Sequence, residues 1–157
     1  DLSIILNVIC MKKYKYIFLS LLIIILDQLS KYLINNNFIL NKEYPLINNF
    51  FYITNAHNTG AAFSILSGYN ILLLLITILT IYILMKNVNK NISFYILLGG
   101  IIGNFIDRIF LGYVRDFLDF RIFNYNFPIF NISDICICIG IFLMIIEVVK
   151  EDKNASR

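Results

Sequence analysis

The stretch that decides the fold is Ile92–Phe110, which reads ISFYILLGGIIGNFIDRIF. It is mostly apolar, lacks the alternation of a half-buried strand, and approaches the length of about 20 apolar residues with which a helix crosses a bilayer core. In lipid, only helices and closed barrels satisfy every backbone polar group. We therefore predict that this stretch is a membrane-spanning helix.

Three further apolar runs, at about residues 17–34, 68–85 and 132–149, have the same character. The chain is 59% hydrophobic and 15% charged, with a mean hydropathy of +0.78, whereas soluble domains have about 45–50% apolar and about 25% charged residues. This composition disfavours a soluble enzyme, a disordered chain and a disulfide-stapled module. The net charge of +3 is too small to indicate a nucleic-acid partner. We expect one integral membrane domain over residues 1–157.

The orientation follows from the positive charges. Eight lysines and arginines precede the first run, follow the fourth or lie between the second and third, and five lie on the other side. We therefore expect both termini to be cytoplasmic. The first run has no cleavage site typical of a secretory signal, so it is interpreted as a retained span. Residues 1–10 precede Met11, and the sequence leaves open whether they belong to the natural chain.

The two outer segments, about residues 35–69 and 111–131, are long and rich in aromatic residues. Residues 50–54 are aromatic and β-branched, and Val114–Phe123 alternates in character, as strands do. The predicted fold class is thus an all-α polytopic membrane protein, with four transmembrane helices and a small extracytoplasmic β-sheet platform.

Polar side chains in the spans are the candidate functional residues, because an ionisable group at mid-membrane costs roughly 2.5–3.5 kcal/mol on insertion scales. Asp27 and Lys31 are four residues apart, and so lie on one helix face. Gly100, Asn104 and Arg108 form a second polar stripe. Each group also has a simpler interpretation. Asp27 and Lys31 could form an ion pair that eases membrane insertion. Gly100 could serve close helix packing, and Asn104 and Arg108 could form hydrogen bonds between helices.

Two further aspartates lie beside the fourth run. Asn131 can cap the last helix, which places Asp134 in its first turn, where a carboxylate is favoured. Asp116 lies in the preceding outer segment beside Arg115. A capping interaction for Asp134 and a solvated surface pair for Asp116 are the alternatives without chemistry.

Most catalytic arrangements are disfavoured by the residues present. The only histidine, His57, has no serine-nucleophile signature nearby, the cysteines lack the spacing of a metal site, and no metal or cofactor is expected. Two neighbouring carboxylates that share a proton could still activate water and protonate a leaving group. The residues alone do not choose the pair. The candidates are Asp27, Asp107, Asp116, Asp119 and Asp134.

The chain resembles the bacterial lipoprotein signal peptidases (signal peptidase II) in five motifs that occur in order. These motifs are Asp27-Gln-Leu-Ser-Lys31, Asn58-Thr-Gly-Ala-Ala-Phe63, Gly99-Gly-Ile-Ile-Gly-Asn-Phe-Ile-Asp-Arg108, Gly112-Tyr-Val-Arg-Asp-Phe117 and Phe127-Pro-Ile-Phe-Asn-Ile-Ser-Asp134. Each motif alone is weak, but five in register with four spans between them form a specific pattern. Arg115 adds a charge beside Asp116, and we expect it to favour the ionised carboxylate.

The resemblance implies an aspartic endopeptidase with Asp116 and Asp134 as the catalytic pair. It implies a monomer in the bacterial inner membrane, in contact with membrane lipids, with its active site near the outer leaflet. Its substrates would be prolipoproteins carrying a diacylglyceryl group on a cysteine, cut just before that cysteine. The residues expected to line or support the site are Asp27, Lys31, Asn58, Gly60, Gly100, Asn104, Arg108 and Asn131.

Two other functions remain open at this point. A proton or ion pathway could use the intramembrane Asp27, Asp107 and Asp134, but these acids gather near one surface instead of crossing the bilayer. A non-enzymatic scaffold could associate through the GxxxG of Gly99 and Gly103. A scaffold does not need costly buried acids.

Overall fold

The computed structural model describes residues 2–60, 66–123 and 125–155. The helices are α1 (Leu2–Asn37), α2 (Asn70–Asn87), α3 (Ile92–Phe110) and α4 (Ile132–Ala155). Within the described residues, four segments are long and apolar enough to span a membrane, and they are Tyr14–Asn37, Asn70–Asn87, Ile92–Phe110 and Ile132–Asn154. Together with a four-stranded antiparallel sheet, these four segments confirm the predicted fold class.

The second span begins two residues later than predicted, at Asn70. Gly68 has a φ of +86°, which a continuous right-handed helix does not allow, so the helix begins only after this turn. The first and fourth helices extend beyond the predicted runs, to Leu2–Asn37 and Ile132–Ala155.

Helix α3 is the centre of the bundle. Half of its span is buried inside the protein, compared with 6–22% of the other three spans, and it contacts α1, α2 and α4. A glycine of α4 allows close packing against α3, because a Cβ at Gly140 would lie 2.7 Å from the backbone nitrogen of Leu97 in α3. The remaining helix faces carry exposed Leu, Ile and Phe, as a lipid-facing surface requires.

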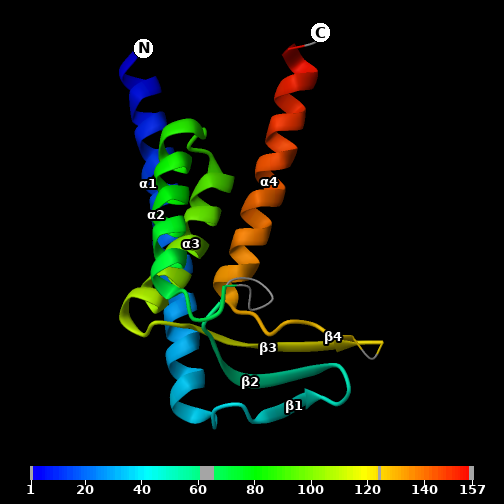
Figure 1. The fold of residues 1–157 in the computed structure, drawn as a ribbon. Coiled ribbons are helices and arrows are strands. Elements are labelled where there is room, and N and C mark those ends of the chain that lie inside the picture. Colours follow the sequence, from blue (N-terminus) through cyan, green and yellow to red (C-terminus); the bar gives the residue numbers. More distant parts are fainter. Residues whose placement is uncertain (1, 61–65, 124, 156–157) are drawn as a thin grey trace.

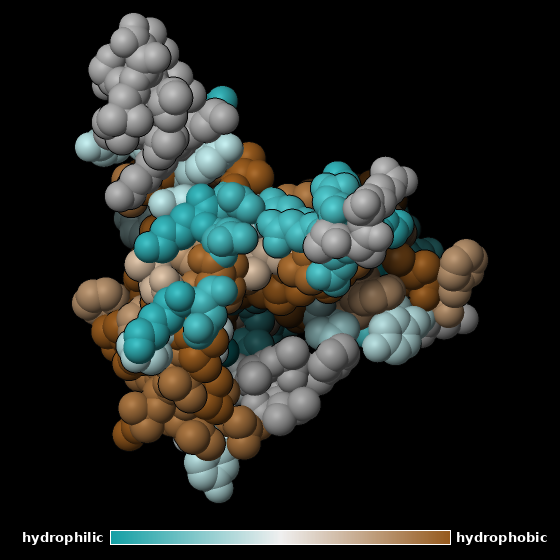
Figure 2. Space-filling view, turned by 90° about the horizontal axis from the view of Figure 1, so that it is seen from above, coloured by the Kyte–Doolittle hydropathy of each residue, from teal (hydrophilic) through white to brown (hydrophobic). Residues whose placement is uncertain are grey.

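The sheet lies at one end of the bundle, while α1 begins and α4 ends at the other (Figure 1). Its antiparallel strands are β1 (Glu43–Ile47), β2 (Phe51–Asn58), β3 (Val114–Ile122) and β4 (Tyr125–Asn126), in that spatial order. The two predicted strands correspond to β2 and β3. Figure 2 views the molecule along the helices from the end opposite the sheet. Hydrophilic side chains gather over the helix ends in this view, and hydrophobic side chains cover the sides of the bundle.

Candidate active site

Asp134 is held in the first turn of α4 by a reciprocal capping interaction. The backbone N–H of Asp134 donates to Oδ1 of Asn131 at 3.0 Å, and the backbone N–H of Asn131 donates to Oδ2 of Asp134 at 3.1 Å. This is the geometry of a capping box. The predicted cap is therefore present, and it fixes one oxygen of the Asp134 carboxylate.

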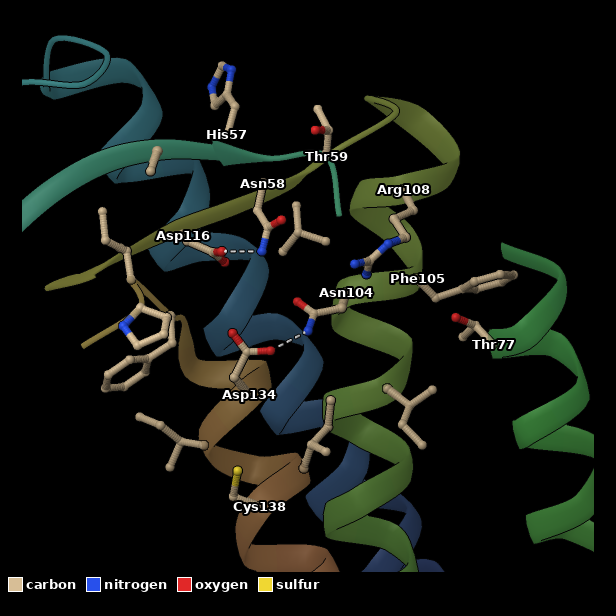
Figure 3. A pocket seen from close by; sticks show the side chains of 18 of the residues that line it. His57, Asn58, Thr59, Thr77, Asn104, Phe105, Arg108, Asp116, Asp134 and Cys138 are labelled. Carbon is tan, nitrogen blue, oxygen red and sulfur yellow. Dashed lines mark hydrogen bonds between the residues drawn. The ribbon is translucent and has the colours of Figure 1, made fainter. Parts of the chain in front are cut away.

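Asp116 reaches the same place from β3, through a change of register in the sheet. Ile53 pairs with Leu118 but Ala56 pairs with Asp116, so between these pairs two residues of β2 oppose one of β3. A bulge of this kind changes which side chains share a face. Beyond it, Asn58 donates from Nδ2 to Oδ2 of Asp116 at 3.0 Å (Figure 3).

Two buried amides connect the two carboxylates. Asn131 donates from Nδ2 to Oδ1 of Asp116 at 2.6 Å and to Oδ1 of Asn104 at 3.1 Å. Asn104 then donates from its own Nδ2 to Oδ1 of Asp134 at 2.7 Å. Figure 3 shows both carboxyl groups at one cavity, with Asn58 and Asn104 beside them. Each carboxylate therefore accepts N–H donors on both of its oxygens.

Burial makes the carboxyl group of Asp116 hard to ionise. Asp116 is 3% exposed, and its desolvation, followed by the negative charge of Asp134, raises its pKa from 3.8 to about 7. The hydrogen bonds from Asn58 and Asn131 oppose this shift only in part. Near neutral pH, Asp116 can therefore hold a proton while its neighbour accepts one, which is the condition for paired acid–base chemistry.

Asp116 and Asp134 line a cavity of about 920 Å³, whose wall is polar near the sheet and apolar between the helices. The sheet side carries His57, Asn58 and Thr59, and the membrane side carries apolar side chains of α2, α3 and α4. A second apolar cavity of about 590 Å³ adjoins it along these helices and shares Thr80, Ile101 and Ile137 with it. A polar reaction centre is thus joined to a long apolar space.

A buried cluster of four charges lies beside this centre. Lys31 contacts Asp27 at 2.8 Å and Asp107 at 3.5 Å, and all three side chains are 0% exposed. Arg115 pairs with Asp107 at 2.6 Å and also donates to Gln28 at 3.0 Å. The ion-pair interpretation of Asp27 and Lys31 therefore agrees with the structure.

The expectation for Arg115 was wrong. Neighbouring residues of a strand point to opposite faces, so Arg115 turns away from Asp116 towards Asp107. Its backbone N–H also donates to Asp107, at 2.9 Å. Arg115 therefore pairs with Asp107 and forms no surface pair with Asp116.

The remaining predicted site residues fall into two groups. Asn58, Asn104 and Arg108 line the cavity with the two aspartates. The others lie behind this wall and support it. A Cβ at Gly100 would come within 2.5 Å of the carbonyl oxygen of Ser133, so the glycine allows α4 to lie close to α3.

Gly60 connects two residues of the cavity wall. Its N–H donates to Oδ1 of Asn58 at 2.9 Å, and its carbonyl accepts from Arg108 at 2.7 Å. Arg108 also adds positive charge near both Asp116 and Asp134. Residues 61–63 of the same motif lie outside the described residues.

His57 is a polar residue of the cavity wall that the sequence did not indicate as a site residue. His57 stacks on Tyr113 with ring centroids 3.9 Å apart, and its Nε2 lies 3.3 Å from Oδ1 of Asn35. Burial and the charge of Arg115 lower its pKa, which favours neutral imidazole. The signal that could have indicated it is its position directly before Asn58, the first residue of the motif Asn58–Phe63.

Across residues 2–60, 66–123 and 125–155, no group of three or more His, Cys, Asp or Glu side chains is arranged to hold a metal ion. The fold and the site together define an integral membrane protein with a pair of buried carboxylates at one end of its helix bundle.

Residues 19–150 match the family model described as signal peptidase (SPase) II. The lipoprotein signal peptidase of Bacillus pumilus is 42% identical over 150 residues, which cover 90% of this chain and 97% of the relative. That of Halalkalibacterium halodurans is 37% identical over 150 residues, with 90% and 96% coverage. The chain therefore belongs to the signal peptidase II family.

Two solved structures agree with this assignment. Both are described as bacterial membrane enzyme structures, determined by the in meso method at 2.3 and 1.9 Å resolution. The first has a TM-score of 0.79 and 37% identity, and covers 89% of this chain and 90% of its own. The second has a TM-score of 0.75 and 38% identity, with 87% and 93% coverage. The protein is accordingly a signal-peptide-cleaving membrane peptidase.

Proposed function

We propose that the protein removes the signal peptide of diacylglyceryl-modified prolipoproteins by aspartic catalysis, with Asp116 and Asp134 as the catalytic residues. The observation that carries this proposal is the convergence of the two carboxyl groups on one cavity, linked through the amides of Asn104 and Asn131. The names of its relatives, lipoprotein signal peptidases, support the substrate class.

The reaction follows from the protonation states of the pair. The ionised carboxylate accepts a proton from water as the water oxygen attacks the scissile carbonyl carbon. The protonated partner donates its proton to the carbonyl oxygen, which gives a tetrahedral gem-diol. The carboxyl group that took the proton from water then donates it to the amine nitrogen as the C–N bond breaks, and a hydroxyl of the gem-diol returns its proton to the other carboxylate. One water is consumed, and the pair returns to sharing one proton. The macroscopic pH dependence belongs to the pair and not to either residue alone.

The shape of the cavity supports a lipid-modified substrate. Its polar end holds the aspartates, and its apolar walls on α2, α3 and α4 can receive acyl chains or the apolar part of a signal peptide. A substrate anchored in the bilayer has to be cut close to the membrane surface. We place the active site near the outer leaflet, both termini in the cytoplasm, and the working enzyme as a monomer in the inner membrane.

A proton or ion pathway is less favoured by the arrangement of charges. Asp27 and Asp107 are engaged by Lys31 and Arg115 in a buried cluster, which disfavours their exchange of protons with a transmembrane path. A scaffold function does not explain why Asp116 and Asp134 are buried together, since burying two carboxyl groups costs the folded state free energy.

The decisive experiment compares two precursors in detergent micelles, one carrying the diacylglyceryl group and one without it. The purified protein is expected to cleave only the lipidated precursor, just before the modified cysteine. Equal cleavage of both precursors would contradict the proposed specificity. No cleavage of either, by protein whose helical circular dichroism shows that it is folded, would contradict the proposed function.

A further inference from the structure

Lys31 makes a contact that charge balance alone does not require. Its ammonium lies 2.9 Å from Oδ1 of Asn104, in addition to its contacts with Asp27 and Asp107. An ammonium has three N–H donors and no acceptor. The three acceptors around Lys31 therefore match its donors, and one of them belongs to a residue of the cavity wall.

This contact and the N–H of Asn131 together favour one direction of the Asn104 amide. Because Lys31 only donates, Asn104 presents its oxygen to Lys31 and its N–H to Asp134, at 2.7 Å. The reversed amide would place NH₂ against an ammonium and a carbonyl oxygen against a carboxylate. Both of those contacts are repulsive in a buried site.

The other two amides around the aspartates are oriented by backbone groups. Oδ1 of Asn58 accepts from the N–H of Gly60, and Oδ1 of Asn131 accepts from the N–H of Asp134. The oxygen of Asn104 is held by side chains, namely Lys31 and the Nδ2 of Asn131. Substituting Lys31, which does not line the cavity, thus removes one of the two groups that hold this amide in its direction.

We propose that Lys31 is a positioning residue, which orients the Asn104 amide so that its N–H stabilises the ionised carboxylate of Asp134. This inference rests on the proposed function of the Asp116–Asp134 pair. Hydrogen bonds donated to a carboxylate favour its charged form. Lys31 therefore acts on the reaction through Asn104, without touching the substrate.

The competing explanation is that Lys31 only neutralises buried acids. The double variant Asp27→Asn, Lys31→Met separates the two explanations, because it removes one negative and one positive charge together. Asp107 keeps its partner Arg115, so the variant leaves no buried aspartate of this cluster without a counter-charge. Lys90→Met, at an exposed lysine far along the chain from the site, is the matched control.

We expect the double variant to remain folded in detergent but to lose about 10- to 100-fold in kcat, the size of one hydrogen bond to a charged group. KM for the lipidated precursor is expected to stay within about twofold, because neither residue lines the cavity. Lys90→Met is expected to match the wild type in both. Wild-type kcat in a folded double variant would overturn the proposal.

The pH profile gives a second readout that a purely structural role would not move. Without the Asn104 donor, the ionised form of the pair is less stable, so the acidic limb of kcat is expected to move up by about one pH unit. An unchanged limb would overturn the proposal. Among the described residues, the charged or titratable side chains that face the pair or its supporting cluster are Asp27, Lys31, His57, Asp107, Arg108, Arg115, Cys136 and Cys138.

Asn104→Asp tests the same step without changing Lys31. The isosteric carboxylate accepts from Lys31 but has no N–H for Asp134, so kcat is again expected to fall with an upward shift of the acidic limb. Wild-type kinetics in this variant would overturn the proposal even if the double variant did not fold. If the wild type itself fails to cleave the lipidated precursor, the proposed function fails first, which is a separate outcome.

Discussion

Replacing Asp116 by asparagine is expected to stabilise the folded protein above neutral pH while abolishing cleavage. In the folded state, burial and the charge of Asp134 raise the pKa of Asp116 from 3.8 to about 7. One pKa unit corresponds to about 1.4 kcal/mol, so the ionised form costs the folded state about 4 kcal/mol. The asparagine side chain has a similar shape but does not ionise, and so avoids this cost.

The sign of the pH dependence follows from the direction of the shift. Because the folded-state pKa is the higher one, the wild-type protein is favoured below the unfolded pKa and loses that advantage as the pH rises towards about 7. The difference in unfolding free energy between Asp116→Asn and the wild type is therefore expected to grow by about 3 kcal/mol from about pH 5 to about pH 8. The variant also loses some stability at every pH, because its new NH₂ group faces the N–H donor of Asn58 or of Asn131 in place of an acceptor oxygen.

The assay is equilibrium unfolding in detergent micelles at both pH values, with cleavage of the lipidated precursor measured on the same samples. Asp119→Asn is the matched control, because it removes another buried carboxylate of β3. Asp119 pairs with Arg121 at 3.2 Å and accepts from Thr54 at 3.0 Å, so its replacement is expected to destabilise the fold. A stability difference for Asp116→Asn that is the same at both pH values would refute the reasoning.

Three further predictions test the support of the site. Arg115→Met leaves the buried Asp107 without its 2.6 Å partner and is expected to cost about 3–5 kcal/mol of unfolding free energy in micelles; a loss below about 1 kcal/mol would contradict the cluster. Gly100→Ala forces a Cβ against the Ser133 backbone at 2.5 Å, whereas Gly99→Ala meets its nearest atoms at 3.1 Å. We expect a larger loss of thermal stability for Gly100→Ala, about 1–3 kcal/mol, and the reverse order would be inconsistent with the packing described. Finally, EDTA is expected to leave the cleavage rate unchanged, and strong inhibition would indicate a metal in the reaction.

The sequence was sufficient for the architecture because membrane spans are constrained by length and composition. The stretch Ile92–Phe110 was predicted with its observed bounds, since apolar residues run up to its polar ends. The start of the second helix was less certain, because hydropathy does not report the turn at Gly68. Strands β2 and β3 were also accessible, through their aromatic, β-branched and alternating residues.

The pairing of Asp116 with Asp134 could not be derived from spacing or composition, and five aspartates remained possible until the family motifs were considered. The reason is physical, because the pairing depends on a bulge between Ile53 and Ala56 that leaves no clear mark in the sequence. Arg115 shows the opposite case. Strand alternation alone places it on the face opposite Asp116, and the expectation of a neighbouring charge had ignored this.

The central claim is that Asp116 and Asp134 together perform the hydrolysis, and single asparagine variants test it most directly. The measurement is the turnover of a diacylglyceryl-modified precursor by folded Asp116→Asn and Asp134→Asn in micelles. Each variant is expected to lose about 10²–10⁴-fold or more in kcat, because either change leaves the pair without an acid or a base. Turnover near the wild-type rate by either one would contradict the account.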